Sequence, residues 1–504
     1  MSDPAAETHS RPGLLGPIRL DHVWAAIPLV FVFYYACSLP IVHSDFFYNL
    51  MNGRLMVEQG ALLDRDVLAY APLRETFYNQ PWLTQLAYFA EMRLGGYPLV
   101  LFVHACAVTA AFALVFAVAR QLSGSVRWAA AATLLSFLVA ALNLSVRPQA
   151  YSFLPFALIL LLLWRYADRG RPLFLVPAVM AIWVNVHGAF LLGFGLVALF
   201  LGAAVLEAMW PWRGTGAIWR SPRVRRLALL LGLTALSMLL NPYGPGIVAY
   251  WILATSDPIA RSLNLEWRPT ALEGPIGVLF FLSWLPIVAL LAISRQRLRW
   301  TEALLLLAFA LFALVSIRNV VWWALVMPPI LVGYAARTWP SAKSMNQARR
   351  EKPALNAVLL GILGIVALLG LPWLRANNPL LAPPLRTYLD AKHPTQAVEF
   401  LRREGIQGKL FSRMEWGGYL EWELWPRLQP LVDARIEIRP PQVWLDYFAI
   451  LDGSARWQAL LDRYQVDYVI LEYQAYPRLE REISTSAAWR EIHRDSLAVV
   501  YARR

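Results

Sequence analysis

The 504-residue chain is poor in charged residues and in cysteine. Only 16% of its residues are charged, whereas soluble domains carry roughly 25%. Its two cysteines, Cys37 and Cys106, lie in apolar stretches, which excludes a disulfide framework and a cysteine-rich metal cluster. A glycine-rich phosphate loop of the P-loop or dinucleotide type is also absent, so the chain carries no motif for a water-soluble nucleotide.

Apolar sequence is what the chain has in abundance. Hydrophobic residues make up 58% of it, and its mean hydropathy is +0.46. Eleven apolar runs approach or exceed the roughly 20 residues that a helix needs to cross the hydrocarbon core of a bilayer. We predict spans near residues 22–42, 97–119, 127–144, 149–166, 172–186, 188–209, 226–241, 275–294, 301–317, 319–336 and 354–374. The fold class is therefore an α-helical polytopic membrane protein with about eleven transmembrane helices.

The net charge of +13 would suggest an acidic partner if the chain were soluble. Of the 28 lysines and arginines before residue 375, however, 20 lie in alternate connections between the predicted spans. Cytoplasmic loops of membrane proteins keep such an excess of basic residues. The distribution predicts a multi-pass protein of the cell (inner or plasma) membrane with a cytoplasmic N-terminus and an extracytoplasmic C-terminus. It gives no reason to expect nucleic acid as a partner.

The composition changes near residue 375 to that of a soluble domain, with 18 basic and 17 acidic residues in the last 130. We divide the chain into a transmembrane domain, residues 1–374, and an extracytoplasmic α/β domain, residues 375–504. Helical spacing predicts helices at 394–404, 442–451 and 456–464, and β-rich runs predict strands at 409–412, 429–433 and 466–471. Residues 489–493 and 497–502 are expected to form a terminal hairpin. The paired glycines Gly417 and Gly418 favour a tight turn.

Polar residues gather on the side predicted to be extracytoplasmic. The first outer loop, residues 43–96, holds two segments with helical apolar spacing, 46–51 and 82–94, which we expect to lie in the membrane interface. The same side has carboxylates in that loop and polar residues at several helix ends. Because ionisable groups at membrane depth are costly and mark functional cavities, one outward-facing cavity is expected. The candidates are Asp45, Asp64, Asp66, Trp82, Arg147, Asn185, His187, Asn241, Glu266 and Arg318.

These residue types suit the transfer of a sugar from a lipid-linked donor. A carboxylate can act as general base on a hydroxyl, and arginines can hold a phosphate whose charge grows as its bond to a sugar breaks. A polyprenyl-phosphate sugar would place its phosphate at the helix ends and its tail in the bilayer. The acceptor could be a glycan, a lipid or a protein.

The chain resembles the GT-C superfamily of membrane glycosyltransferases, in particular its multi-spanning bacterial and archaeal branch. The similarity covers most of the chain and depends on the order of several short elements. They are residues 43–54 (HSDFFYNLMNGR), 64–66, 79–83, 147–148, 183–188, 241–244, 266–267, 318–319, 416–420 and 432–437. The resemblance implies an inverting hexosyl or pentosyl transfer from a polyprenyl-phosphate sugar, in which a first-loop aspartate deprotonates the acceptor.

The roles of individual residues follow from the resemblance and the chemistry together. Asp45 and Asp66 are the candidates for the catalytic base, and the choice between them stays open, because Asp45 lacks the second adjacent carboxylate common in the family. Asp64, Trp82, Arg147, Asn185, His187, Asn241, Glu266 and Arg318 are candidate substrate-binding residues. The carboxylates of the first loop could also hold Mg²⁺ or Mn²⁺, although no ligand spacing is visible.

Structural explanations compete with each of these assignments. Asp45 could cap a helix, the other two aspartates could serve turns, and His187 could be a hydrogen-bonded packing residue. Arg147 and Glu266 could form a structural ion pair, and Arg318 could extend to the interface. Two further functions remain as alternatives: a flippase or transporter of lipid-linked glycans, and a non-catalytic membrane assembly protein.

Overall fold

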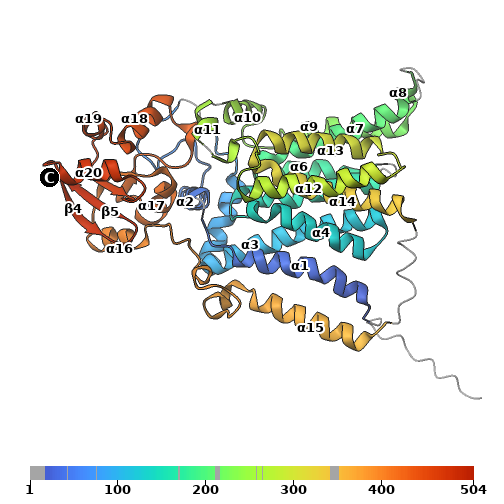
Figure 1. Ribbon diagram of the computed structural model, residues 1–504. Coiled ribbons are helices and arrows are strands. Elements are labelled where there is room, and N and C mark those ends of the chain that lie inside the picture. The colour runs from blue at the N-terminus through green and yellow to red at the C-terminus, as the bar shows by residue number, and fades with distance from the viewer. Residues whose placement is uncertain are drawn as a thin grey trace, which may run out of the picture.

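A computed structural model describes residues 18–42, 44–74, 77–167, 171–210, 216–256, 258–263, 265–340 and 351–504. Eight residues that contribute to the basic connections, to the first-loop carboxylates or to the element 43–54 lie outside this part of the chain: Arg11, His43, Glu75, Arg169, Arg213, Lys343, Arg349 and Arg350. The described residues form a helical bundle with an α/β domain at one end (Figure 1). We call that end of the bundle the domain end.

Each of the eleven predicted spans overlaps a helix of the bundle. These helices are α1 (Leu20–Ser38), α3 (Trp82–Ser123), α4 (Val126–Ala140), α5 (Phe153–Tyr166), α6 (Leu175–Trp183), α7 (Leu191–Met209), α9 (Pro222–Ser237), α12 (Gly274–Ile293), α13 (Trp300–Val315), α14 (Val320–Thr338) and α15 (Pro353–Leu369). Among the described residues, seven helices are long and apolar enough to cross a membrane, and α13, α15 and a helical segment containing α6 are shorter but apolar. Almost all of α14 is buried, so this helix forms the centre of the bundle.

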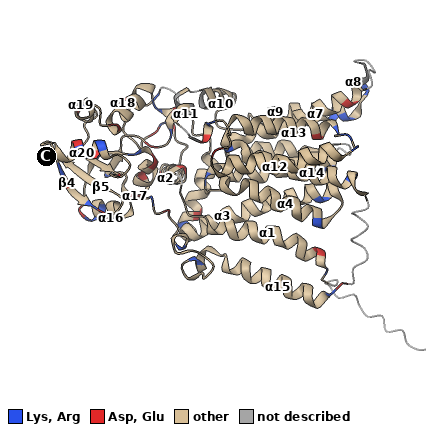
Figure 2. Cartoon of the chain, in the orientation of Figure 1, with Lys and Arg blue, Asp and Glu red and all other residues tan. Residues whose placement is uncertain are grey.

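Successive helices run in alternate directions, and the basic residues follow this alternation. Arg120, Arg165 and Arg337 lie in the last turns of α3, α5 and α14. Figure 2 shows lysine and arginine gathered at bundle ends remote from the α/β domain, whereas the helix surfaces between the two ends are nearly free of charge. We call this gathering of lysine and arginine at the remote end the basic belt. A chain that enters the bundle at this end and crosses it eleven times leaves at the opposite end, where the α/β domain lies.

The helix α3 combines a predicted interfacial helix with a predicted span. Its backbone leaves helical geometry at Gly96, where φ is 62° and ψ is −160°. Glycine adopts a positive φ without the steric cost that a Cβ atom would add. The kink separates residues 82–95, which lie at the domain end, from the part of α3 that passes through the bundle (Figure 1).

Arg375 follows the last helix of the bundle and binds the end of its earliest helix, α1. It lies in the short helix η8 (Pro372–Asn377), after the last span, and its side chain is almost fully buried. Its guanidinium donates to the carbonyl oxygens of Ser38 at 2.8 Å and Leu39 at 3.0 Å, and its Nε donates to Leu385 O at 2.6 Å. The last carbonyls of a helix have no partner within it, so Arg375 caps the C-terminus of α1. The predicted domain boundary at residue 375 falls within η8 and remains a prediction.

The C-terminal part, residues 395–504, is the predicted mixed α/β domain. Its five strands are β1 (Gly408–Ser412), β2 (Leu428–Pro430), β3 (Tyr468–Leu471), β4 (Trp489–Arg494) and β5 (Val499–Arg503), in the order β2-β1-β3-β5-β4. β1 pairs in parallel with β2 and β3, and the terminal hairpin β4–β5 joins in antiparallel. The predicted helices are α16 (Thr395–Arg403), α18 (Pro441–Leu451) and α19 (Trp457–Arg463). The sequence did not predict α17 (Met414–Leu424) and α20 (Pro477–Thr485).

The glycine pair lies inside α17, so the prediction of a tight turn there was wrong. Both glycines are helical and buried, and they allow close packing. A Cβ atom on Gly418 would lie 2.7 Å from the backbone oxygen of Ser44, at the start of α2 (Ser44–Gln59). The Gly418 amide also donates to Ser44 Oγ at 3.3 Å. The missing side chain thus lets α17 contact the first turn of α2 directly.

The helix α2 is present as predicted, but its apolar face packs against other parts of the protein. Its buried residues pack between α3 and α17, with Phe46 5.0 Å from Tyr88 and Phe47 5.1 Å from Tyr419 between ring centroids. The expectation that this face lies on the membrane surface was therefore wrong. Because α3 and α17 pack on both sides of α2, they fix the position of its first turn.

Residues 66–74 of the first loop also run along the α/β domain. The amides of Tyr70 and Ala71 donate to the carbonyls of Pro430 and Leu431, each at 3.1 Å, beside the edge strand β2. Asp66 is fully buried and forms ion pairs with Arg435, at 2.9 Å, and with Arg439. Arg435 is paired with Asp433 as well. These contacts join the first loop and the α/β domain through a buried cluster of opposite charges.

Glu421 of α17 is enclosed beside this cluster without a close cation. Both carboxylate oxygens are buried and lack a hydrogen-bond partner within the described chain, and Arg435 is 3.9 Å away. Burial and the charge of Asp433 raise the pKa of Glu421 well above its usual value. For Asp433, burial opposes the charge, but the adjacent Arg435 lowers the pKa to about 2. Glu421 is thus the member of the cluster that favours the neutral form.

Gly418→Ala is expected to destabilise the contact between α17 and α2. The added methyl group must displace backbone atoms of Ser44, and overpacking of this kind costs about 1–3 kcal/mol. Thermal unfolding of the purified protein should show a lower midpoint, and amide hydrogen exchange should become faster in residues 44–49. Gly364→Ala in α15 is the matched control, since no atom lies within 4 Å of the place that its added methyl group would take. Equal exchange in the two variants would contradict this account.

Glu421→Gln is expected to stabilise the protein at neutral and alkaline pH. A carboxyl group whose folded pKa is raised keeps its proton in the folded state, so its contribution to stability falls as pH rises above the unfolded pKa of about 4.3. Glutamine has no proton to lose. The difference in thermal midpoint between Glu421→Gln and wild type should therefore grow between pH 5 and pH 8, while the exposed control Glu482→Gln shows no such trend. A difference that shrinks with pH would refute the assignment.

Candidate active site

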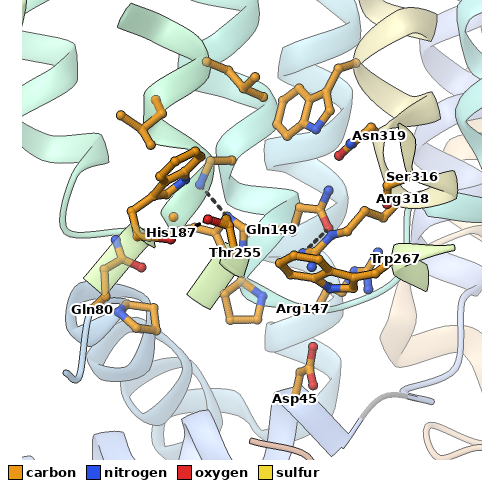
Figure 3. Close-up of a pocket in the computed structure, with 18 of the residues that line it drawn as sticks. Asp45, Gln80, Arg147, Gln149, His187, Thr255, Trp267, Ser316, Arg318 and Asn319 are labelled. Carbon is orange, nitrogen blue, oxygen red and sulfur yellow. Dashed lines mark hydrogen bonds between the residues drawn. The ribbon is translucent and has the colours of Figure 1, made fainter. Parts of the chain in front are cut away.

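A cavity of about 670 Å³ opens at the domain end of the bundle. Its walls come from α2, from the segment just before α5, from the beginnings of α7 and α14, from the end of α13, and from α10 (Gly246–Ser256) in the long connection after α9. Four of the ten predicted site residues line it: Asp45, Arg147, His187 and Arg318. Figure 3 shows Asp45 on one side of the cavity and the two arginines and His187 on the other.

Asp45 lies in the first turn of α2, where a negative charge is favoured by the helix dipole. Its backbone oxygen accepts a bond from Asn49 at 2.6 Å, but its carboxylate has no hydrogen bond or ion pair with any described residue. The carboxylate lines the cavity, as Figure 3 shows. A carboxylate that is free of partners and faces a cavity is available to bind a ligand or to take a proton.

Arg147 and Glu266 form the ion pair that the sequence suggested. Arg147 precedes the short helix η2 (Pro148–Ser152), and its Nη1 donates to both carboxylate oxygens of Glu266, at 2.7 and 2.6 Å. Arg147 is buried, and its Nε has no hydrogen-bond partner within the described residues. The charge of Arg147 is thus largely compensated, although one of its donors is still unused.

Arg318 is held by neutral groups. It lies in η6 (Ile317–Asn319), directly before α14, and its Nη2 donates to Gln149 Oε1 at 3.2 Å. Its guanidinium also lies 5.6 Å from the ring centroid of Trp267. It forms no ion pair within the part of the chain that the structure describes. Arg318 therefore brings an uncompensated positive charge to the cavity, held in place by an amide and an aromatic ring.

His187 contributes a hydrogen-bond donor of fixed identity. It precedes η4 (Gly188–Phe190), and its Nδ1 accepts a bond from the amide of Ala189 at 3.1 Å. An amide nitrogen can only donate, so Nδ1 carries no proton and the neutral ring carries its proton on Nε2. Burial, and then the charges of Arg318 and Arg147, lower the pKa of His187 to about 3, so the ring does not take up a second proton at neutral pH.

Three of the predicted substrate-binding residues instead hold the scaffold together. Trp82 Nε1 donates to Asn185 Oδ1 at 2.8 Å, and Asn185 Nδ2 donates to the carbonyls of Ala181 and Leu240, each at 2.9 Å. Asn241 closes a turn by accepting a bond from the Tyr243 amide at 2.8 Å. None of these three side chains lines the cavity. They connect the beginning of α3 with the ends of α6 and α9.

The other two aspartates of the first loop are also outside the cavity lining. Asp66 is paired with Arg435 and Arg439 in the buried cluster, and Asp64 is exposed. Across the described residues, no group of three or more histidine, cysteine, aspartate or glutamate side chains is arranged to hold a metal ion. A divalent cation at the first-loop carboxylates stays a prediction.

Several cavity residues were not among the predicted site residues. Tyr48 and Asn49 follow Asp45 on α2, and Gln149 follows the Arg147–Pro148 element. Tyr48 and Asn49 lie inside the element 43–54 and Gln149 directly follows the element 147–148, so the sequence did carry a usable signal for them. Tyr250 and Thr255 lie on α10, whose position over the cavity depends on tertiary packing and left no such signal.

A scan against protein-family models and a search of curated proteins found no match to this chain. Solved structures do match. ArnT from Cupriavidus metallidurans bound to undecaprenyl phosphate is 16% identical, with a TM-score of 0.51, and the match covers 95% of this chain and 97% of that one. ArnT from the same organism in the apo state is 15% identical, with a TM-score of 0.52 and the same coverage. At this identity the likeness shows the fold. The chain is a polytopic membrane protein with the fold of ArnT, including a C-terminal α/β domain, and this is the fold class predicted from the sequence.

Proposed function

We propose that this protein is an integral-membrane glycosyltransferase that moves a sugar from a polyprenyl-phosphate donor to an acceptor hydroxyl on the outer face. The observation that carries the proposal is the pairing of opposite charges across one cavity. A carboxylate without a partner, Asp45, faces an arginine without a counter-ion, Arg318, within the described part of the chain. The GT-C fold and the undecaprenyl phosphate bound to ArnT support a lipid-phosphate donor.

The donor phosphate would bind at the arginine side of the cavity. Guanidinium groups bind phosphate oxygens through charge-assisted hydrogen bonds, and Arg318 has donors to spare. The unused Nε of Arg147 is buried nearby. Apolar residues beyond the arginines offer a surface for the first isoprene units: Leu191, Leu192, Phe312 and Val315.

Asp45 would act as the general base. As it takes the proton from the acceptor hydroxyl, the hydroxyl oxygen forms a bond to the anomeric carbon. The bond from that carbon to the phosphate oxygen breaks, and its electron pair leaves with the polyprenyl phosphate. A single displacement from the face opposite the phosphate inverts the anomeric configuration. The phosphate gains negative charge in this step, and Arg318 is placed to stabilise it.

Asp66, the other candidate base, is less suited to this role. Its two oxygens are bound by Arg435 and Arg439, and its side chain is fully buried away from the cavity lining. A buried carboxylate whose two oxygens are already bound to two guanidinium groups is not free to bind an acceptor hydroxyl. We therefore assign the base to Asp45 and give Asp66 the role of joining the first loop to the α/β domain.

His187 would bind the sugar rather than transfer a proton. Its Nε2–H is a donor, and its Nδ1 is occupied by the Ala189 amide. The phosphate leaving group needs no proton, so a neutral donor beside the arginines fits a sugar hydroxyl. The basic belt at the remote end of the bundle supports an extracytoplasmic location for the cavity and for the α/β domain.

Asp45→Asn is expected to abolish transfer while leaving donor binding intact. Loss of a general base lowers the rate by about 10²–10⁴-fold. The assay uses purified protein in liposomes with a panel of radiolabelled undecaprenyl-phosphate monosaccharides and measures label transferred to lipid, glycan or protein acceptors. Asp64→Asn, which alters an exposed aspartate of the same loop, is the matched control and should retain the wild-type rate.

Transfer by Asp45→Asn at the wild-type rate would contradict a mechanism in which Asp45 is the general base. Movement of the labelled donor across the bilayer without any transfer, in the wild-type protein, would favour the flippase function instead.

Arg318→Gln is expected to weaken the binding of undecaprenyl phosphate by tenfold or more, because a charge-assisted bond to phosphate contributes about 1.5–3 kcal/mol. Binding can be followed by the ligand-induced rise in thermal midpoint. Arg297→Gln, at an exposed position of the remote end, serves as control and should bind the lipid as the wild type does. Unchanged affinity of Arg318→Gln for undecaprenyl phosphate would show that Arg318 does not bind the phosphate.

A further inference from the structure

The two arginines that line the cavity, Arg147 and Arg318, lie on the same side of it but bind different partners (Figure 3). Arg147 donates to the carboxylate oxygens of Glu266 at 2.7 and 2.6 Å. Arg318 donates to the amide oxygen of Gln149 at 3.2 Å. Glutamine has nearly the shape of glutamate but carries no charge. The charge of Arg147 is therefore largely compensated by its partner, whereas the charge of Arg318 is available to a ligand.

The bond from Arg318 also determines which way the Gln149 amide points. A guanidinium nitrogen can only donate, so the amide atom that faces it is Oε1, and Nε2 points elsewhere. Gln149 lines the cavity and is only 3% exposed. Within the described ranges of the chain, Nε2 has no hydrogen-bond partner, and protein does not enclose it completely. Its N–H groups are therefore open to the cavity.

A phosphate that binds Arg318 would also be within reach of this amide. The two side chains are in contact with each other, and both line the cavity. Hydrogen bonds to a charged acceptor are shorter and stronger than those between neutral groups. Gln149 therefore offers a phosphate oxygen a second donor beside the guanidinium, and it does so without adding a charge.

The charges on this side of the cavity match those of a phosphodiester. The two lining arginines and the carboxylate of Glu266 together carry one net positive charge, and His187 is neutral. A sugar–phosphate–polyprenyl donor is a phosphodiester with a single negative charge. The polyprenyl phosphate left after transfer is a monoester, which carries about −1.5 to −2 at pH 7. Because Coulomb energy is proportional to the product of two charges, each added positive charge would favour the product over the donor.

We propose that Gln149 is a phosphate-binding residue of this cavity, and that its neutral amide keeps the net charge of the arginine side at one. Its oxygen orients Arg318, and its nitrogen donates to the phosphate. A glutamate at this position would compensate Arg318 as Glu266 compensates Arg147, and no net charge would be left for the donor. Glu266 has the converse role, because it prevents a second free charge that would retain the product. The proposal rests on the proposed function and adds a specificity residue to the same site.

Three substitutions of similar shape test the proposal by binding alone. Purified variants in detergent are titrated with undecaprenyl phosphate, and the bound fraction is measured by native mass spectrometry. Gln149→Glu should weaken binding at least tenfold, because it compensates Arg318 and repels the phosphate. Gln149→Met, which removes the donor without adding a charge, should weaken it at least threefold. Glu266→Gln should tighten it at least threefold. Gln296→Glu, at an exposed position of the remote end, is the control for an added negative charge and should bind as the wild type does.

Two further measurements separate this account from a general effect of the substitutions. Gln149→Glu places a carboxylate beside Arg318, so its thermal midpoint without lipid should be no lower than that of the wild type. Undecaprenol, which has the tail but no phosphate, should bind equally to all variants. A parallel change in undecaprenol binding would show that the variants act on the tail, and would overturn the proposal.

Wild-type affinity of Gln149→Glu or of Gln149→Met for undecaprenyl phosphate would overturn the assignment of Gln149 as a phosphate-binding residue. Unchanged or weaker binding by a folded Glu266→Gln would overturn the account of the charge. If the expected order of affinities holds while no sugar is ever transferred, the phosphate site stands and the proposed transferase function fails. If transfer occurs while Gln149→Glu binds as the wild type does, the function stands and this proposal fails.

Discussion

The ion pairs that Asp66 makes with Arg435 and Arg439 are the constraint on which the site depends. Charges removed from water are tolerated only when they are paired, so these three residues hold the first loop and the α/β domain in one relative position. The helix α2, which belongs to the first loop, is packed between α3 and α17 of the α/β domain, and Asp45 lies in its first turn. The residues that line the cavity all precede the α/β domain, but that domain packs against α2. The position of the proposed base therefore depends on residues far along the chain.

Much of the fold could be predicted from sequence because the membrane imposes strong composition rules. Apolar runs located the eleven bundle helices, and the basic residues between them indicated which helix ends share a side. Short-range signals failed where glycine was involved. Gly417 and Gly418 suggested a turn, since glycine frees the backbone, whereas in α17 they serve close packing against Ser44. The apolar face of α2 likewise looked suited to a membrane surface, because nothing local reveals that α17 covers it.

The candidate site was predicted in part, for a physical reason. Every polar group at the buried end of a helix needs a partner, whether it binds substrate or supports the scaffold. Trp82, Asn185 and Asn241 satisfy one another or nearby carbonyls, whereas Asp45, Arg318 and the Nε2 of His187 face the cavity. The sequence shows the residue types but not their hydrogen-bond partners, so scaffold residues and cavity residues look alike in it.

The cap that Arg375 provides has a consequence for the order in which the protein is completed. α1 leaves the ribosome before the other bundle helices, but the guanidinium that binds its last carbonyls belongs to a residue made after all of them. Until then, the end of α1 must be satisfied by water at the membrane surface. α15 also packs chiefly on α1. The bundle is therefore completed only when the last of its eleven helices packs against the earliest one. A chain released before Arg375 would insert its helices and still lack this closure.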